Sequence, residues 1–366
     1  MNSVWKASIS NKGWSAWLLT TVLTSFYVLI YWYPNVLGYH KNGNTGFIAL
    51  FDSFSKLLKN KPASQWFVYG VLYTIAILFF GVKMLRKYRH NRYIQYRTFS
   101  VIFFQLIFAF LLPELMMRNN LPYNDFKNIW PLNYYFFFDW HLNELFLAGN
   151  FGLFILFWGV ISFLIIAPIL TYFYGKRWYC SWVCGCGGLA ETAGDSFRHL
   201  SDKSLIAWTV EKFLVYSILA FAIIMTGMTI FTQITRQATI LFLDSFVLRD
   251  WYGFFIGAAF SGVVGVGFYP ILGSRIWCRF GCPMAAYLGI LQKYVSRFRI
   301  SVNGEQCISC GNCSTFCEMG IDVRAYAQEG QDFVRASCVG CGLCADVCPR
   351  GVLKLENSPI KIVQKH

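Results

Sequence analysis

Charged side chains are scarce in this sequence, and acidic residues are fewer than basic ones. Only 14% of the 366 residues are charged, whereas soluble globular proteins carry about 25%. Hydrophobic residues make up 56% of the chain and aromatic residues 19%. This shortage of charge excludes an ordinary water-soluble globular protein and indicates that much of the chain lies in lipid.

Histidine is also rare, which limits the cofactors that the chain can bind. The five His residues offer no convincing ligand pair within an apolar segment, so no haem site is indicated. The net charge of +14 is of the kind that nucleic-acid-binding proteins carry. However, the basic residues lie mostly in short loops between apolar runs, as membrane topology requires. We therefore expect a lipid bilayer as a partner and no nucleic acid.

Six apolar runs are long enough to cross a bilayer, because a helical span needs about 20 mostly apolar residues. They are residues 14–33, 66–82, 98–117, 151–174, 213–231 and 251–272. The loops assigned to the inner side hold 17 Lys and Arg residues, and those on the outer side hold eight. The positive-inside rule then places both termini in the cytoplasm, and we expect the protein in the inner (cytoplasmic) membrane.

These patterns predict a mainly α protein with two domains. Residues 1–300 are expected to form a polytopic bundle of six transmembrane helices. Residues 301–366 are expected to form a compact, polar, cysteine-rich domain with a C-terminal tail.

Eight of the thirteen cysteines form two runs with one spacing, Cys-x2-Cys-x2-Cys-x3-Cys. Each cysteine of the second run follows its counterpart by 31 residues, which indicates an internal duplication. The runs are Cys307, Cys310, Cys313 and Cys317, then Cys338, Cys341, Cys344 and Cys348, with Pro349 after the last. This spacing is typical of bacterial ferredoxins with two [4Fe–4S] clusters, in which the fourth Cys of each run binds the other cluster.

The predicted ligand sets therefore cross between the two runs. The first cluster takes Cys307, Cys310, Cys313 and Cys348, and the second takes Cys338, Cys341, Cys344 and Cys317. Two zinc sites would also use four thiolates each, but they do not explain the doubled run with its closing Cys-Pro. Glu318 follows Cys317 where Pro is usual, which removes no ligand. With a short helix expected at residues 323–328, we predict a bacterial-type 2[4Fe–4S] ferredoxin-like α+β domain.

The other five cysteines form a second repeat, at the inner ends of the fourth and sixth apolar runs. The copies read Gly175-Lys-Arg-Trp-Tyr-Cys180-x3-Cys184-Gly-Cys186 and Gly273-Ser-Arg-Ile-Trp-Cys278-x3-Cys282-Pro283. Two cysteines four residues apart share one face of a helix. Because both spans run from outside to inside, we expect the copies to face one another at the cytoplasmic surface and to offer four thiolates.

Several roles are compatible with Cys180, Cys184, Cys186, Cys278 and Cys282. They can form a third metal site, a redox-active thiol pair or a docking surface for the ferredoxin-like domain, or they can be small buried hydrophobic residues. Thiolates suit iron–sulfur clusters, copper(I) and zinc, so the metal stays open. A structural disulfide is disfavoured on the reducing side of the membrane.

Taken together, these features resemble the NosR/NapH/CcoG family of membrane-bound polyferredoxins. The resemblance covers most of residues 150–355, and Gly-x-Arg-x-aromatic-Cys-x3-Cys is its most specific part. In that family both motifs usually end in Cys-Pro; here the second does, whereas the first reads Cys184-Gly185-Cys186. The resemblance implies electron transfer that supports a respiratory reductase or the maturation of a metal centre outside the membrane.

The predicted outer loop, residues 118–150, contains a weaker candidate site. Asp139-Trp-His141 can line a site for a quinol or a partner protein, or it can belong to an interfacial aromatic belt. Glu114, near the outer end of the third span, can accept quinol protons or serve as a capped interfacial carboxylate.

The sequence as a whole favours a membrane-bound electron-transfer component over a stand-alone enzyme. Electrons would pass between the cytoplasmic clusters, the inner-face thiols and either the quinone pool or a redox partner, within a respiratory or maturation complex. The bilayer core is about 30 Å thick, so an outward route needs a quinone, a further cofactor or another subunit. The alternatives are a copper-binding metal reductase or assembly factor that uses the membrane thiols, and a redox-sensing membrane regulator.

A reporter that is active on only one side of the membrane, fused to the C-terminus, tests this orientation. We expect the cytoplasmic signal, because the loops assigned to that side carry the excess of Lys and Arg. A second fusion within the loop 118–150 should report the opposite side. An outer-side signal from the C-terminal fusion would overturn the predicted topology.

Overall fold

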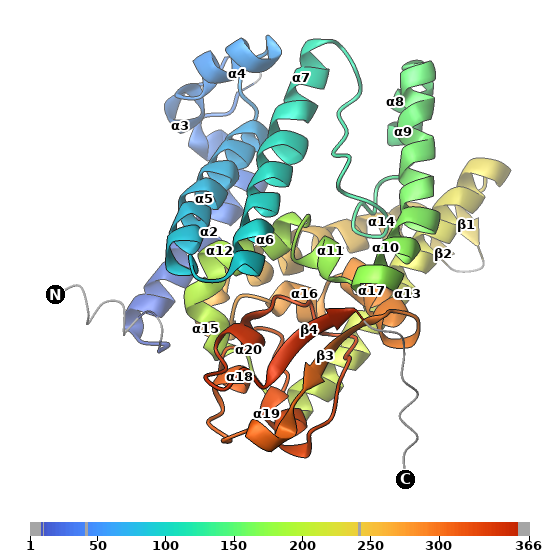
Figure 1. Cartoon of the computed structure of the whole chain (residues 1–366). Coiled ribbons are helices and arrows are strands. Elements are labelled where there is room, and N and C mark those ends of the chain that lie inside the picture. The colour runs from blue at the N-terminus through green and yellow to red at the C-terminus, as the bar shows by residue number, and fades with distance from the viewer. Residues whose placement is uncertain (1–8, 10, 41–42, 241–242, 358–366) are drawn as a thin grey trace.

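The computed structural model describes residues 9, 11–40, 43–240 and 243–357, and the expected mainly α fold is confirmed (Figure 1). Most of the long helices occupy the upper part of the view, and the cysteine-rich segment lies below them, beside the first turns of the helix that begins at Leu205. A layer of short helices lies between the two. It consists of α11 (Arg177–Cys180), α12 (Gly185–Thr192), α16 (Ile276–Phe280) and α17 (Pro283–Tyr294).

Five helices are long and apolar enough to cross a membrane, with mean hydropathies between 1.4 and 2.7. They are α2 (Trp14–Trp32), α5 (Gln65–Lys87), the segment Arg92–Arg118, the segment Asn150–Tyr174 and α13 (Leu205–Thr235). The third consists of α6 (Arg92–Phe103), η2 (Phe104–Leu111) and α7 (Leu112–Arg118); the fourth consists of α9 (Asn150–Ile161), η3 (Ser162–Ile166) and α10 (Ala167–Tyr174). These helices correspond to the first five predicted spans and make the chain a membrane protein.

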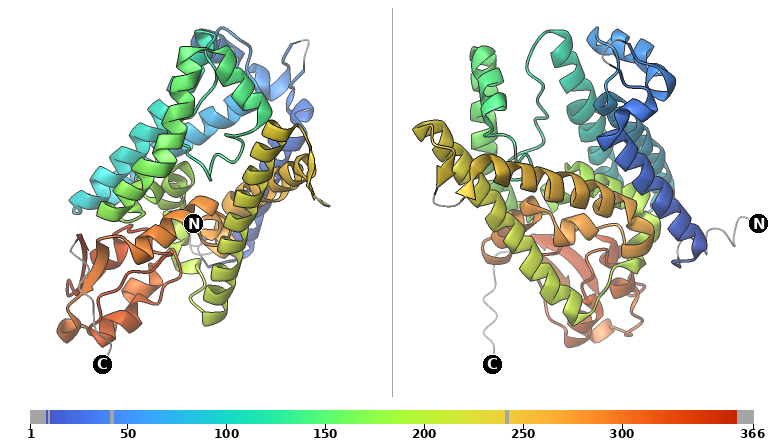
Figure 2. Two further views of the ribbon diagram at one scale, coloured as in Figure 1. Left: turned by 90° about the vertical axis from the view of Figure 1, so that its right-hand side faces the viewer. Right: turned by 180° about the vertical axis from the view of Figure 1, so that it is seen from behind.

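The sixth predicted span, residues 251–272, is not among these five helices, so the six-helix bundle is not confirmed. Helix α14 (Ser245–Trp251) continues into η5 (Tyr252–Gly267), and a short helix, α15 (Tyr269–Leu272), begins after Phe268. Glycines let η5 approach α2 closely, since a Cβ on Gly262 would lie 1.9 Å from the Tyr27 ring. Figure 2 shows η5 steeply inclined to α9.

Shorter elements connect the long helices. They are η1 (Pro34–Leu37), α3 (Gly46–Ala49), α4 (Asp52–Lys59), α8 (Asp139–Leu147), η4 (Ala193–Leu200) and the paired strands β1 (Thr239–Ile240) and β2 (Leu243–Asp244). Helices α3, α4 and α8 lie at the end of the molecule remote from the cysteine-rich segment (Figure 1).

The cysteine-rich segment is built around one antiparallel strand pair. Strand β3 (Phe298–Val302) pairs with β4 (Leu353–Asn357), with Ile300 opposite Leu355. Between them lie η6 (Gly304–Gln306), α18 (Asn312–Thr315), α19 (Val323–Glu329) and α20 (Leu343–Asp346). Helices α18 and α20 each begin after a left-handed glycine, with φ of 79° at Gly311 and 83° at Gly342. The short helix expected at residues 323–328 is α19.

The two predicted domains share one hydrophobic core. Tyr179 and Leu288 of the helical layer belong to the same buried cluster as Phe298 and Val339 of the cysteine-rich segment. Gln292 of α17 fastens the contact, because its amide donates to the carbonyls of Arg335 (2.8 Å) and Cys338 (2.7 Å). Its side-chain oxygen also accepts from the backbone N–H of Lys176 (2.8 Å).

Replacing Gln292 by Leu is expected to loosen this contact. The change leaves the carbonyl of Cys338 and the N–H of Lys176 buried without their partner, and each such group costs about 1–3 kcal/mol, whereas the carbonyl of Arg335 keeps the N–H of Cys338. We expect a lower thermal unfolding midpoint in detergent and faster proteolysis of residues 298–357. The exposed Gln331→Leu is the matched control and should behave as wild type. Equal midpoints for both variants would contradict this account of the docking.

Candidate functional site

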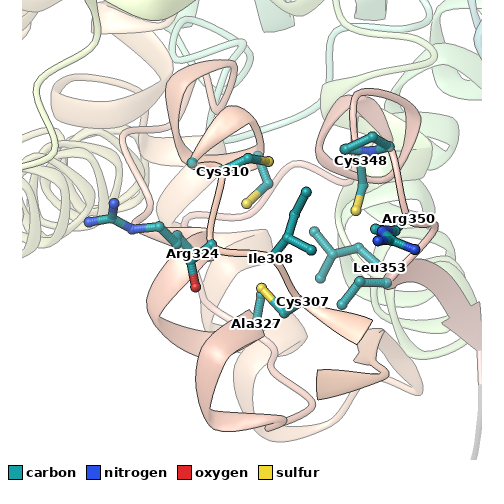
Figure 3. Close-up of a pocket in the computed structure, with 13 residues that line it drawn as sticks. Cys307, Ile308, Cys310, Arg324, Ala327, Cys348, Arg350 and Leu353 are labelled. Carbon is teal, nitrogen blue, oxygen red and sulfur yellow. The ribbon is translucent and has the colours of Figure 1, made fainter. Parts of the chain in front are cut away.

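Two cavities in the cysteine-rich segment are each lined by four cysteines. The first is lined by Cys307, Cys310, Cys313 and Cys348. Figure 3 shows the sulfur atoms of Cys307, Cys310 and Cys348 turned towards this space. The structure thus places the fourth cysteine of the second run beside the first three cysteines of the first run.

The second cavity mirrors the first. It is lined by Cys338, Cys341, Cys344 and Cys317. Burial raises the pKa of the Cys338 thiol to about 11 and that of Cys341 to about 12. A buried thiolate needs nearby positive charge, which a bound metal centre supplies. Here too the fourth cysteine comes from the other run.

The arrangement of these side chains bears on the kind of metal centre that fits. Among the described residues, no three His, Cys, Asp or Glu side chains are close enough together to hold a single metal ion. The cysteines of each cavity instead surround a space. A four-iron cluster fits such an arrangement, since each of its thiolates binds a different iron atom.

The membrane-side cysteines lie in the layer of short helices, but not on continuous helical faces as predicted. Cys180 ends α11, a turn follows, and Cys184 precedes α12; Cys278 lies in α16, and Cys282 precedes α17. In the second copy Pro283 explains the break, because the residue before a proline is driven out of the helical conformation. The expectation that each pair shares one helix face is therefore wrong.

The two copies nevertheless lie together. Cys180, Cys184, Cys278 and Cys282 are buried in one cluster, and Cys186 packs against it. The guanidinium of Arg275 joins the copies, since its Nη1 lies 3.2 Å from the carbonyl oxygen of Cys180 and 3.6 Å from the sulfur of Cys278. Burial, with a smaller contribution from neighbouring thiols, raises the pKa of Cys180 to about 12. Four thiols thus converge in a region where an uncompensated thiolate is costly.

A buried network of arginines and glutamates connects these thiols to the second cavity. Arg275 Nε lies 3.0 Å from Glu318 and its Nη2 lies 2.5 Å from Glu191. Arg198 also binds Glu318, and Arg97 Nε lies 2.6 Å from Glu191. All five side chains are at most 2% exposed. Burial alone would raise the pKa of the Glu318 carboxyl, but Arg198 and Arg275 hold this pKa below its usual value.

The sequence did not reveal this network, although two signals pointed towards it. Glu318 stands where Pro is usual, and Arg275 occupies the position that Arg177 has in the first motif copy. The two arginines contact different parts of the protein. Arg177 lies over the Phe298 ring (4.9 Å from its centroid) and donates to Asn357 (2.9 Å), so it contacts the strand pair instead.

The weaker outer candidates have protein partners. Glu114 pairs with Lys59 (3.2 Å), and Asp139 lies 2.9 Å from the amide of Gln233 and 3.4 Å from Arg249. The Nδ1 of His141 lies 3.0 Å from the carbonyl oxygen of Phe136. These contacts tie α4 to α7 and the outer loop to α13 and α14.

Comparison with known proteins supports iron–sulfur chemistry in both regions. Residues 300–355 match a 4Fe-4S dicluster domain, and residues 155–204 and 253–303 match a 4Fe-4S binding domain that contains the two membrane-side motifs. The chain is therefore an iron–sulfur membrane protein. It is 27% identical over 172 residues to the Escherichia coli (strain K12) protein named "Putative electron transport protein YccM". The match covers 45% of this chain and 46% of that relative, less than half of its length; no solved structure matches.

Serine replacements test the crossed ligand sets of this iron–sulfur protein. We expect Cys348→Ser and Cys307→Ser to alter the same electron paramagnetic resonance signal of the reduced protein, because both residues line the first cavity. Cys317→Ser and Cys338→Ser should alter the other signal. Cys186→Ser, outside both cavities, is the control. If Cys348→Ser affects the signal that Cys338→Ser affects, the crossed assignment is wrong.

Proposed function

We propose that this protein is a membrane-bound electron-transfer component whose C-terminal domain carries two [4Fe–4S] clusters. The observation that carries the proposal is the pair of cavities, each lined by three cysteines of one run and the fourth of the other. That crossing is the ligand pattern of two-cluster bacterial ferredoxins. Such clusters exchange single electrons and need no substrate pocket of their own. The similarity to a protein named for electron transport supports the same function.

We assign the ligands as the sequence predicted them. Cys307, Cys310, Cys313 and Cys348 hold one cluster, and Cys338, Cys341, Cys344 and Cys317 hold the other. The membrane-side thiols of Cys180, Cys184, Cys278 and Cys282 supply the ligands of a third iron–sulfur centre. Their burial in one cluster and the match to a 4Fe-4S binding domain support this choice over copper.

The contacts around Arg275 connect these centres. Glu318 follows the ligand Cys317 and binds Arg275, which itself reaches Cys278 and the carbonyl of Cys180. Arg97 also donates to the carbonyl of Cys341. Fixed charges and packed side chains hold redox centres at constant separation and exclude water, which favours electron transfer between them.

The wider setting follows from topology and from the family resemblance. We place residues 1–300 in the inner membrane and residues 301–366 on its cytoplasmic side, with the sixth span formed by α14, η5 and α15. A quinone or another redox protein then exchanges electrons with the membrane-side thiols. In this proposal the protein supports a respiratory reductase or a system that matures metal centres, as the NosR/NapH/CcoG family does.

Metal analysis of anaerobically purified protein tests the proposal. Two clusters require about eight iron atoms per chain, and a third centre raises this to about twelve. We expect the Cys278→Ser/Cys282→Ser variant to lose about four of them while the signals of the two ferredoxin clusters persist, because these residues lie outside both cavities.

Two results would contradict this assignment. Zinc in place of iron in the wild-type protein would end the electron-transfer proposal. Unchanged iron with lost copper binding in the double variant would make the membrane thiols a copper site.

A further inference from the structure

A third cavity, of about 630 Å³, lies where the membrane helices meet the cysteine-rich segment. Its walls come from the first turns of α13, from α16 and α17, and from the segment around residues 334–337. Cavities that hold cofactors or other small molecules have volumes of about 300–1,000 Å³. The proposed electron transfer assigns no ligand to this space.

Most charged residues that line the cavity are basic. Its basic residues are Lys176, Lys212, Arg279, Lys293 and Arg335. The acidic residue of the lining, Glu211, is paired with Arg279 at 2.7 Å. The cavity therefore retains a surplus of positive charge, which attracts an anion.

Two guanidinium groups of the lining each have one nitrogen without a hydrogen-bond partner among the described residues. Arg279 is 3% exposed; its Nε binds Glu211 and its Nη1 donates to the carbonyl of Asp202. Its Nη2 is buried and has no hydrogen-bond partner among the described residues. The same holds for Nη2 of Arg335. Buried donors without acceptors cost free energy, so two of them on side chains that line one cavity favour a ligand whose acceptor they meet when these side chains turn towards it.

Aromatic rings line the same space. The Trp208 ring lies under the ammonium of Lys212 (3.4 Å) and the guanidinium of Arg335 (4.4 Å). Tyr216 and Tyr294 are 37% and 68% exposed and belong to the same lining. Cationic groups beside exposed rings suit a ligand with an anionic head and a larger organic part.

We propose that this cavity binds an organic molecule that carries a phosphate group. Guanidinium forks match phosphate geometry, and Lys176, which is 1% exposed, adds a further positive charge deep in the lining. The phosphate oxygens accept hydrogen bonds from the Nη2 groups of Arg279 and Arg335. The organic part lies towards Trp208 and Tyr294. This binding is independent of the proposed electron transfer, although Cys278 in the lining places the ligand beside the membrane-side thiols.

Phosphate of this kind has two sources, a phospholipid headgroup and a water-soluble organophosphate. Leu205, Ile206 and Phe213 of the same helix are largely exposed, so lipid can reach the opening from the bilayer. A soluble organophosphate reaches it from the aqueous side of the cysteine-rich segment. Both sources share the recognition by Arg279 and Arg335.

Native mass spectrometry of the full-length protein in detergent tests the proposal, with phosphatidylglycerol and flavin mononucleotide as separate titrated probes. We expect one of the two to bind wild-type protein at one molecule per chain. The Arg335→Gln/Lys212→Gln variant should bind that probe about tenfold more weakly or worse, because it removes two positive charges and a charged hydrogen-bond donor from the lining. Lys354→Gln, an exposed change on β4, is the control and should leave affinity unchanged.

If wild type binds phosphatidylglycerol and the double variant does not, the natural ligand is a phospholipid. If this holds for flavin mononucleotide instead, the natural ligand is a water-soluble organophosphate. Iron content and the reduced-state signals should match wild type in both variants, which shows that the fold is intact. Binding of neither probe, or equal binding by wild type and the double variant, overturns the inference.

Discussion

The contact of Glu318 with Arg198 and Arg275 is the constraint on which this architecture depends. It joins the residue after Cys317 to the helical layer that holds the membrane-side thiols, and it is buried almost completely. Removing several charges from water is costly, so the arrangement persists only because every charge finds a partner. Loss of Glu318 would remove one of the two carboxylates that each guanidinium contacts, because Arg275 would keep only Glu191 and Arg198 only Asp195.

These ion pairs fix the position of the cysteine-rich segment relative to the helical layer, so the segment is not a domain on a flexible tether. Gln292 and the shared apolar core hold the same interface from the other side of the helical layer. Rotation of the cysteine-rich segment would break the charge pairs, the amide hydrogen bonds and the packing together. Electron transfer gains from such rigidity because it depends steeply on the distance between centres. The basic cavity beside Cys278 owes its walls to the same interface.

The membrane-side repeat shows how two copies of one motif take different tasks. Arg275 reaches the thiols and both buried glutamates, whereas Arg177 supports the strand pair. Cys282 is followed by Pro283, which starts α17, whereas Cys184 is followed by Gly185, whose carbonyl accepts from the Tyr73 hydroxyl. The copies are thus similar in backbone but unequal in their surroundings, which suits a site that faces lipid-embedded helices on one side and the ferredoxin-like segment on the other.

Local pattern determined a large part of this protein. Length and hydropathy predicted five of the membrane helices, because a span depends on near neighbours in the chain, and the spacing of the eight ferredoxin cysteines predicted the crossed sets that line the two cavities. Tertiary structure alone decided the rest. The meeting of Glu318 with Arg198 and Arg275 and the basic cavity at Arg279 and Arg335 arise from residues far apart in sequence. Such contacts produce no periodic pattern in the sequence. They stabilise the protein only after folding has brought the residues together and removed the water between them.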